Sequence, residues 1–579
     1  MIDLLHALNP GLCVIAAGLI CTLLPVGQLR KALVVAAPIF AAFMIHTIYP
    51  FGGEDVMTGK VNFGGIELTT LRVDRLSVVW AYLFCLAGVI NGIYGLHEKC
   101  RITDSSALIY TGAAIAGVMA GDMITLFVFW ELTAISSVFL IWKGGERAYA
   151  AGLRYLAIHV FSGVLLLTGA VMHASANGGD FTFGYIGLDS AGGWLLLIAM
   201  GIKCGFPMLH MWMQDAYPKA SITGTVILAS FTTKFAIYAL ARGFPGTDIL
   251  IWIGAVMTCF PVFFAVVEND LRRVLAYSLN NQLGFMVCGI GIGSTLALNG
   301  VVGQVFLHVI FKGLLFMSIG AVMYRTGTAK ASELGGLFRS MPFTTVLCLI
   351  GAASIAAVPL FAAFVTKAMI LAAAVNDHHY IAFLMMLFAS AGVMEHSGIK
   401  VPHFTFFAHD SGRRVKEAPW NMLLAMSIAA VICIVMAFPW GGYQMLYAMM
   451  PFGESVDYKP YTVDHVVFQM QLLFAAIFAF TLLKRRGLYP AERRAEILDV
   501  DWTYRRAGLA VVKWIGAMWA RASVLTTRLR NRAMQESGKR LYQVFSPAGR
   551  FSEAAPSGLA AVMTAATLVL VLIIEYIAR

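Results

Sequence analysis

The sequence predicts an all-α polytopic membrane protein with about 16 transmembrane helices, and three observations carry this prediction. Of the 579 residues, 59% are hydrophobic and 13% are charged, whereas soluble domains average about 25% charged residues. Apolar stretches recur along nearly the whole chain, and most can cross a hydrocarbon core of about 30 Å. The segments between them alternate between many and few basic residues, as expected of a chain that crosses a membrane repeatedly.

The predicted spans follow one another from the first apolar stretch to the end of the chain. In order, they cover residues 8–27, 32–50, 75–96, 105–121, 123–142, 149–173, 190–213, 221–241, 247–266, 274–295, 298–323, 341–375, 380–398, 419–440, 460–483 and 559–577. Up to residue 494, one side of the membrane then receives 21 lysines and arginines, and the other side receives five. Because cytoplasmic loops are enriched in basic residues, the first side is predicted to be cytoplasmic and both termini extracytoplasmic.

Three segments between the spans have a different character. Residues 51–74 are rich in glycine and alternate in polarity, which predicts a small β-hairpin on the outer face. Residues 399–418 are polar and predict a cytoplasmic loop. Residues 501–550 are basic and amphipathic, which predicts a C-terminal lateral helix at the cytoplasmic interface before the final span. Such a helix can anchor the chain to the membrane surface or strap it to a neighbouring subunit, and the charge pattern does not separate the two.

Composition and motifs argue against several function classes. The nine cysteines are scattered and form no CxxC pair, which argues against a metal or iron–sulfur site and against a disulfide framework. No Gly-rich phosphate-binding loop occurs, so ATP is not a predicted energy source. The net charge of +11 is accounted for by the predicted cytoplasmic segments, and no nucleic acid is a predicted partner. A cleavable signal is not expected, because the first apolar stretch has no basic leader.

Five ionisable side chains lie well inside predicted spans: Glu131, Lys203, Lys234, Lys312 and Lys367. A charge at this depth costs about 3 kcal/mol even on the lenient insertion scale, so it indicates a function. Snorkelling explains lysines at the ends of spans but not lysines near the middle. A buried amine also gives up its proton more readily, because burial destabilises the ammonium form. The structural alternative is an ion pair that only holds helices together, and it applies to Glu131 above all.

Prolines interrupt two of these spans close to a lysine. Pro207 follows Lys203 by four residues, and Pro359 precedes Lys367 by eight. Proline removes a backbone hydrogen bond, and broken helices at membrane depth are tolerated where they line a wet cavity. The recurrence in both halves of the chain predicts two broken helices in two related half-channels.

Other polar residues in the spans are weaker candidates. His308 lies four residues before Lys312 on the same helix face, and histidine can relay protons near neutral pH. Gln282 is polar within its span and can bind water. Arg154 and His159 share one span, but Arg154 is near its end and can snorkel. A structural role is the alternative for both.

Six segments carry a resemblance to a known family: FVFWELTAISS, KCGFPMLHMWMQDAYPKAS, TTKFAIY, DLRRVLAYSLNNQLGF, HVIFKGLLFMSIG and VPLFAAFVTK, in that order. Over roughly residues 60–400 the chain resembles the proton-antiporter-like membrane subunits of respiratory complex I and of Mrp-type sodium/proton antiporters. Residues 501–577 resemble the extension of the distal antiporter-like subunit of complex I. Leu228, Gln282 and Lys367 resemble the pattern of the D-type Mrp subunit, because complex I members often have histidine or glutamate there.

The resemblance implies a role for each matching residue. Glu131 and Lys203 form the charge-coupled pair of the proton-input half, Lys234 is the connecting lysine, and Lys367 is the exit-side titrating group. The predicted proton-translocation residues are Glu131, Lys203, Lys234, His308, Lys312 and Lys367, with His210, Gln282, Arg154 and His159 as accessory candidates. The predicted regions are N-terminal spans with the outer hairpin (1–100), the antiporter-like core (101–400), C-terminal spans (401–498), and the lateral helix with the last span (499–579).

The leading functional prediction is a membrane subunit of a multi-subunit monovalent cation (Na⁺)/H⁺ antiporter, an ion translocase rather than a catalyst of bond chemistry. The expected partners are other membrane subunits, the lipid bilayer, protons and Na⁺, in a bacterial inner membrane, with no cofactor. Two alternatives stay open: a proton-pumping subunit of a redox-driven complex, such as a hydrogenase or a complex I relative, and a proton path that powers inorganic carbon uptake. A non-transporting scaffold would leave five buried charges unexplained.

Overall fold

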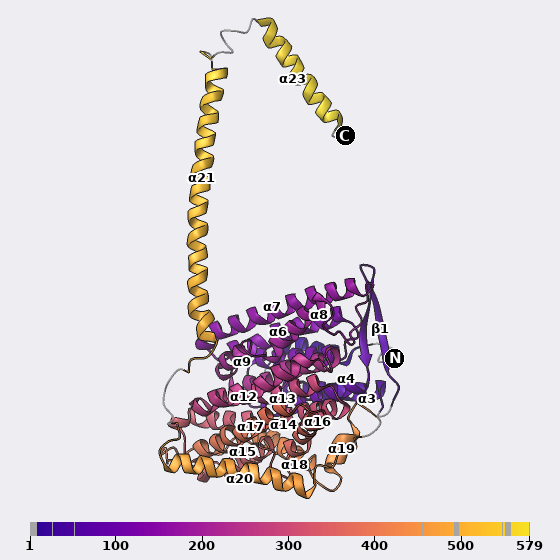
Figure 1. The fold of residues 1–579 in the computed structure, drawn as a ribbon, viewed down its shortest axis with the longest axis vertical. Helices are drawn as coiled ribbons and strands as arrows, with labels where there is room; N and C mark the ends of the chain where they lie inside the picture. Colours follow the sequence, from indigo (N-terminus) through magenta and orange to yellow (C-terminus); the bar gives the residue numbers. More distant parts are fainter. Residues whose placement is uncertain are drawn as a thin grey trace. The chain divides into compact units, whose positions relative to one another are not determined.

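The computed structural model describes residues 8–25, 27–50, 53–453, 456–490, 497–546, 548–549 and 557–577. The predicted positions of the two termini, and of Arg493 and Arg494, fall outside these residues. The chain is mostly helical and forms two compact units, residues 1–497 and 498–579. In the first unit the helices run side by side, and the β-hairpin lies at one end of them (Figure 1).

The first unit contains the helices and strands that follow in chain order: α2 (Pro10–Leu23), α3 (Gln28–Ile48), β1 (Val56–Phe63), β2 (Ile66–Val73), α4 (Arg75–Tyr94), α5 (Arg101–Val118), α6 (Met123–Trp142), α7 (Glu146–Ala176), α8 (Ala191–Cys204), α9 (Met211–Ala216), η1 (Tyr217–Lys219), α10 (Ile222–Leu228), α11 (Thr232–Gly243), α12 (Asp248–Val267), α13 (Leu271–Ile292), α14 (Thr295–Thr326), η2 (Ala331–Glu333), η3 (Leu337–Arg339), α15 (Pro342–Ile355), α16 (Ala362–Asn376), α17 (Tyr380–Val393), η4 (Met394–Lys400), η5 (His403–Phe407), α18 (Trp420–Val435), α19 (Gly442–Ala448) and α20 (Val463–Arg485). Each of the first fifteen predicted spans overlaps one or more of these helices, and several helices extend a few residues beyond the predicted bounds. Across both units, eleven helices among the described residues are long and apolar enough to cross a membrane. The predicted fold class, an all-α polytopic membrane protein, is confirmed.

The predicted hairpin is present as the antiparallel strands β1 and β2, and it leads directly into α4. Asp74 caps the first turn of α4, where its Oδ1 accepts a hydrogen bond from the Ser77 amide at 2.8 Å. A cap of this kind satisfies a backbone N–H that has no earlier carbonyl in the helix. The same carboxylate binds Arg72 of β2 and Arg242 of α11, each at 2.8 Å. Hairpin, α4 and α11 are thereby tied together at one end of the bundle.

The two helix breaks predicted from prolines are both present. Both breaks contain the same type of turn. Residues 206–209 and 358–361 each form a turn closed by an amide–carbonyl hydrogen bond, of 2.8 Å and 3.0 Å respectively. Each has proline at its second position and a positive φ at its third, 70° at Met208 and 75° at Leu360. This is the type II pattern, whose third position normally takes glycine. The two halves of the chain therefore use the same device to interrupt a helix.

A third break lies where the sequence predicted one continuous span. Residues 221–241 form two helices, α10 and α11, separated by Ala229–Phe231. No proline or glycine marks this position, so the pattern of breakers could not reveal it. The prediction of a loop over residues 399–418 is wrong in its first part, because wide helical turns η4 and η5 continue α17 as far as Phe407.

The second unit contains η6 (Thr503–Gly508), α21 (Leu509–Phe545) and α23 (Ser557–Ile577). The predicted helix of residues 501–550 is thus present over Thr503–Phe545, and the last predicted span is helical. None of the residues of α21 is buried within the chain. Its position flat against a membrane or along a neighbouring subunit stays a prediction, as does the division of the first unit into three regions.

Candidate functional site

All four lysines predicted for proton translocation are buried in the first unit, each on its own helix. Lys400 of η4 is buried as well, and the sequence had placed it in a cytoplasmic loop. Lys203 lies on α8, Lys234 on α11, Lys312 on α14 and Lys367 on α16, and none is more than 3% exposed. Helix α8 contacts α11, α11 contacts α13, and α13 contacts α14, which in turn contacts α16. The lysines therefore lie along one continuous series of packed helices rather than on the outer surface of the bundle.

Lys203 is held against α6 at the break of its own helix. Its ammonium donates hydrogen bonds to the backbone oxygen of Trp130 and to Thr133 Oγ1, the latter at 2.8 Å. The same nitrogen lies 4.3 Å from the centroid of the Trp130 ring. Because Ser162 accepts a hydrogen bond from the indole N–H at 3.1 Å, the ring itself is fixed. The ammonium is thus anchored one residue away from Glu131.

Glu131 is half-buried on α6, with its carboxylate turned toward α7. A Cβ added at Gly163 would lie 1.7 Å from Glu131 Oε1, so only glycine leaves room for this carboxylate. Among the described residues, Oε1 has no hydrogen-bond partner. The expected pair with Lys203 is therefore not a direct salt bridge, because the lysine donates to Trp130 and Thr133 instead. Coupling between the two charges stays a prediction.

Lys234 lies just after the third helix break and uses the carbonyl that the break leaves open. Its Nζ donates to the Ala229 oxygen at 2.5 Å. The next residue, Ser230, accepts a hydrogen bond from Asn91 Nδ2 of α4 at 3.1 Å. Asn91 also lines a cavity of about 20 Å³ between α4, α5 and α10, with Thr223 on its opposite wall. That volume suffices for about one water molecule with several polar partners.

His308 and Lys312 lie one turn apart on α14, and both are fully buried. Neither ring nitrogen of His308 has a hydrogen-bond partner among the described residues, and the Nζ of Lys312 has none either. The Lys367 Nζ likewise has none, and it lies 4.8 Å from the centroid of the Phe285 ring. These three side chains carry buried polar atoms that the protein alone does not satisfy, as expected where water or a transient proton completes the site.

A chain of buried amides connects the helices around Lys367. Thr366 donates its hydroxyl to Gln304 Oε1 at 2.6 Å, and Gln304 donates to Gln282 Oε1 at 3.0 Å. Gln282 donates to Asn281 Oδ1 at 2.9 Å, and Asn281 donates to the Thr258 carbonyl. All donors point in one direction, from α16 through α14 and α13 to α12. The accessory candidate Gln282 is thus one member of this hydrogen-bonded chain. Gln304 and Thr366 were not predicted, because neutral polar residues are common in helices and do not stand out in the sequence as a buried lysine does.

Of two other accessory candidates, Arg154 has structural partners, whereas the ring nitrogens of His159 have no hydrogen-bond partner among the described residues. Arg154 binds Asp215 at 2.7 Å, and Lys219 binds the other oxygen of the same carboxylate at 2.6 Å. Burial opposes ionisation of Asp215, but these two cations outweigh it and keep the pKa of Asp215 below its ordinary value. His159 is fully buried, with its ring 4.5 Å from the ring of Trp212. Neither side chain contacts one of the buried lysines through a hydrogen bond.

Further buried polar residues lie near the helix breaks. His210 precedes α9, with its ring 4.6 Å from that of Phe260. Among the described residues, the amide of Asn280 has no hydrogen-bond partner, and its Oδ1 faces the break of α8 at Gly205. His396 is fully buried in η4. The run of two asparagines and a glutamine at 280–282 could have revealed Asn280. His396 lies near the end of the predicted span 380–398, so its burial was less clearly indicated than that of the mid-span lysines.

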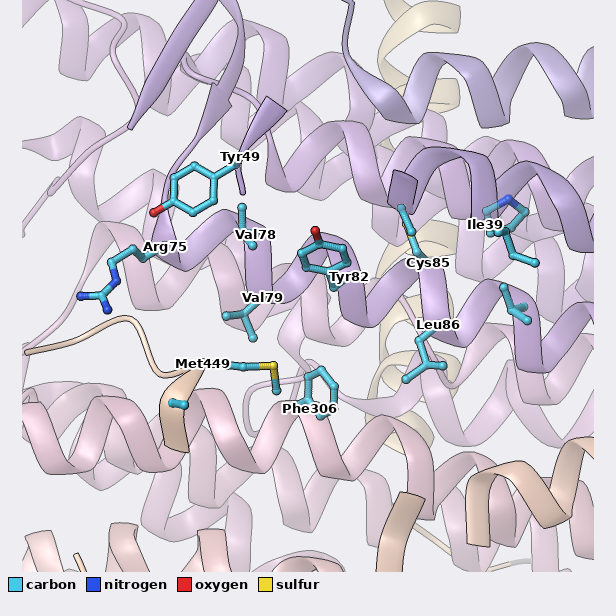
Figure 2. A pocket seen from close by; sticks show the side chains of 14 residues that line it. Ile39, Tyr49, Arg75, Val78, Val79, Tyr82, Cys85, Leu86, Phe306 and Met449 are labelled. Atoms are coloured by element: carbon cyan, nitrogen blue, oxygen red, sulfur yellow. The ribbon is translucent and has the colours of Figure 1, made fainter. Parts of the chain in front are cut away.

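The best-formed apolar cavity of the described residues lies away from the buried lysines. A cavity of about 370 Å³ lies between α3, α4, α14 and α19, and none of the ten candidate residues lines it (Figure 2). No group of three or more His, Cys, Asp or Glu residues that could hold a metal occurs in the part of the chain that the structure describes. The arrangement suits the movement of protons between fixed side chains better than the binding of an organic substrate.

The chain is similar to membrane subunits of known ion-translocating complexes. Residues 120–393 match the family described as "NADH:quinone oxidoreductase/Mrp antiporter, TM". A D-type Na⁺/H⁺ antiporter subunit of Alkalihalophilus pseudofirmus is 33% identical over 295 residues, which is 46% of this chain and 59% of the relative. Hydrogenase-4 component B of Escherichia coli is 25% identical over 512 residues, which is 78% of this chain and 74% of the relative.

A solved structure shares the fold. A chain in the structure of the Mrp complex from Dietzia sp. has a TM-score of 0.76 with 23% sequence identity, over 91% of this chain and 62% of that chain. The chain spans about half the length of the first curated relatives it matches, between 40% and 59%. The resemblance predicted from six sequence segments is confirmed: residues 120–393 match the family model, and the chain is similar to membrane subunits of Mrp antiporters and of NADH:quinone oxidoreductase.

Proposed function

We propose that this chain is a membrane subunit of a multi-subunit Na⁺/H⁺ antiporter and that it moves protons along a buried axis of Glu, Lys and His side chains. One observation carries the proposal: four lysines are buried on contacting helices, and none has a carboxylate partner among the described residues. A buried amine without a counter-charge is easily deprotonated, and the arrival of a neighbouring charge decides when it binds a proton.

The immediate neighbours of the lysines suit repeated proton transfer. Lys203 donates to the carbonyl of Trp130 within α6, and Lys234 donates to the Ala229 carbonyl at the end of α10. A carbonyl accepts a hydrogen bond from either form of the amine and does not fix its charge, so loss of the proton breaks no ion pair. Lys312 and His308 extend the axis on α14, and Lys367 ends it beside the amide chain. In this scheme Glu131 supplies the charge that first displaces the proton of Lys203.

The cation and the other subunits complete the proposal. An ammonium has the wrong charge to bind Na⁺, which prefers oxygen ligands, so we place the sodium site on a partner chain of the complex. The relatives include a subunit of a sodium/proton antiporter, and the solved neighbour is part of an Mrp complex. We therefore infer a hetero-oligomeric assembly in a bacterial inner membrane, with the basic loops on the cytoplasmic side.

A second candidate function is a proton-pumping subunit of a redox-driven complex. The observation that favours it is coverage: the match to hydrogenase-4 component B extends over 78% of this chain and 74% of the relative. The same lysines would carry the protons, and only the source of energy would differ. The electron-transfer centres would then belong to partner subunits.

The test uses the whole complex in sealed vesicles, with a sodium gradient and no electron donor. Proton movement driven by sodium alone is the result expected of an antiporter, and Lys203→Ala should abolish it. The matched control is Lys459→Ala, which removes an exposed lysine on a connecting segment. Sodium-driven exchange that persists unchanged in Lys203→Ala would refute the role of this lysine. Proton movement that requires an electron donor would instead establish the redox-driven function.

A further inference from the structure

The cavity between α3, α4, α14 and α19 is a feature that the transport proposal does not use. One wall is a single face of α4, with lining residues every three or four positions from Arg75 to Val89. Ile39 of α3, Phe306 of α14 and Met449 next to α19 complete the walls. Figure 2 shows the labelled side chains spread along the length of α4 rather than gathered around one point.

The length of this cavity matches a lipid chain. The fourteen residue steps from Arg75 to Val89 correspond to about 21 Å at the α-helical rise. Half of a hydrocarbon core is about 15 Å thick, and the headgroup region adds several ångströms. The cavity therefore extends from one membrane surface, where α4 begins, to about the middle of the bilayer.

The shape of the cavity suits a narrow occupant. Its lining residues on α4 follow one face of the helix as a single row, along which one extended acyl chain can lie. Apart from two tyrosines and one arginine, the lining side chains are aliphatic, aromatic or sulfur-containing, as such an occupant needs.

One end of the cavity is polar and basic. Arg75 and Tyr49 lie together at this end, and Ile39 and Leu86 lie toward the other (Figure 2). Arg75 is exposed, and its one hydrogen bond within the described residues is a long one of 3.3 Å to the Gly453 carbonyl. No carboxylate among the described residues pairs with it. Its planar guanidinium is therefore open to an anion, and phosphate matches its paired donors.

We propose that this cavity is a binding site for one anionic phospholipid, with the phosphate on Arg75 and one acyl chain along α4. The apolar wall and the single cation at its membrane end match the two ends of such a molecule. Because α3 and α14 form opposite walls, the bound chain joins an N-terminal helix to the helix that carries His308 and Lys312. This site does not depend on the proposed transport function.

The experiment measures lipid retained by the purified full-length chain. The protein is stripped of lipid in detergent, incubated with phosphatidylglycerol, and examined by native mass spectrometry. One tightly retained lipid is expected for the wild type. Arg75→Gln should weaken retention about tenfold, as for loss of one charge-assisted contact. Val79→Trp should abolish it by filling the cavity, and Arg147→Gln, which changes an exposed arginine of α7, should leave it unchanged.

Three results would overturn the proposal. The first is equal retention by the wild type and Val79→Trp when both elute as folded protein. The second is equally tight binding of diacylglycerol with the same acyl chains, which would exclude a role for Arg75 and phosphate. The third is displacement of the lipid by an isoprenoid quinone at equal concentration, because the site would then be built for a different apolar ligand.

Discussion

At the scale of single residues, the buried lysines differ from structural ones in what surrounds their nitrogen. Two buried carboxylates have opposite charges in contact: Asp74 binds two arginines, and Asp215 binds an arginine and a lysine. Lys203 and Lys234 instead donate to carbonyl or hydroxyl oxygens. The first arrangement fixes a charge permanently, whereas the second tolerates both protonation states. The surroundings of Lys203 and Lys234 therefore fit the proton transfer that we propose for them.

The carboxylate of Asp74 provides a test of the structural class. Burial opposes its ionisation, but Arg242, the Ser77 amide and Arg72 outweigh burial and lower the pKa of Asp74 to about 2. A free aspartate has a pKa of about 3.9, so the folded chain binds this proton less tightly than the unfolded chain. Its stabilisation is therefore present above about pH 4 and is lost as the pH falls through about 2.

We expect Asp74→Asn to lower the free energy of unfolding at pH 7 by about 2–3 kcal/mol, because it removes this stabilisation. The difference from wild type should shrink as the pH falls from about 4 to about 2. Thermal unfolding in detergent at several pH values measures it. Asp410→Asn is the control, because Asp410 and its partner Arg414 are both exposed. An equal loss in both variants at pH 7 would contradict the account.

The amide chain beside Lys367 provides a test of buried polar contacts. Gln304→Leu leaves the Thr366 hydroxyl and Gln282 Oε1 without their partners, which should cost about 1–3 kcal/mol. Gln282→Leu should have a similar cost. Because the two residues contact each other, the double variant should lose at least about 0.5 kcal/mol less than the sum of the single losses. A double-mutant cycle by thermal unfolding measures this coupling, and strict additivity would show that the contact is absent.

At the scale of elements, the sequence predicted helix breaks only where proline marks them. Pro207 and Pro359 indicated two interruptions, and both are present. The third break, at Ala229–Phe231, and the wide turns of η4 contain no breaker, so only tertiary contacts can specify them. The position of Lys234 near the middle of a predicted span was enough to select it. Its contact with the Ala229 carbonyl could not be predicted, because in a continuous helix that carbonyl would accept a backbone hydrogen bond.

The shared turn after each proline predicts which substitutions the breaks accept. A branched side chain is strongly disfavoured at positive φ, so Met208→Val and Leu360→Val should each destabilise the chain by about 1–2 kcal/mol. Met208→Gly and Leu360→Gly should have no such cost. Leu349→Val is the control, since Leu349 is a partly exposed leucine inside α15. Equal melting temperatures for the valine and glycine variants would show that the left-handed conformation is not required.

The candidate site was only partly predictable, because its contacts also depend on tertiary structure. A lysine in an apolar run is visible in a sequence, and all four lysines are indeed buried. Which oxygen each lysine contacts depends on the crossing of helices that are far apart in the chain, as between Lys203 and Trp130. Asn280 and Gln304 were overlooked because neutral amides are common in helices and only burial makes them significant.

At the scale of the whole molecule, the first unit places its titratable side chains on helices that touch in sequence, from α8 through α11, α13 and α14 to α16. Such a series can pass charge displacement along the bundle without any moving domain. The second unit, residues 498–579, shares none of these residues and has its own contacts. The proposed lipid site joins α3 and α4 to α14 and so supports one side of the series.

The measurement that tests the central claim most directly is proton flux through the whole complex in vesicles, with Lys234 or Lys312 replaced by methionine. Methionine keeps the length of the side chain, and because no carboxylate among the described residues pairs with either lysine, the fold should be retained. The account predicts a loss of flux of about a hundredfold or more in each variant, with Lys459→Met unchanged. Wild-type flux through folded Lys234→Met and Lys312→Met complexes would contradict it.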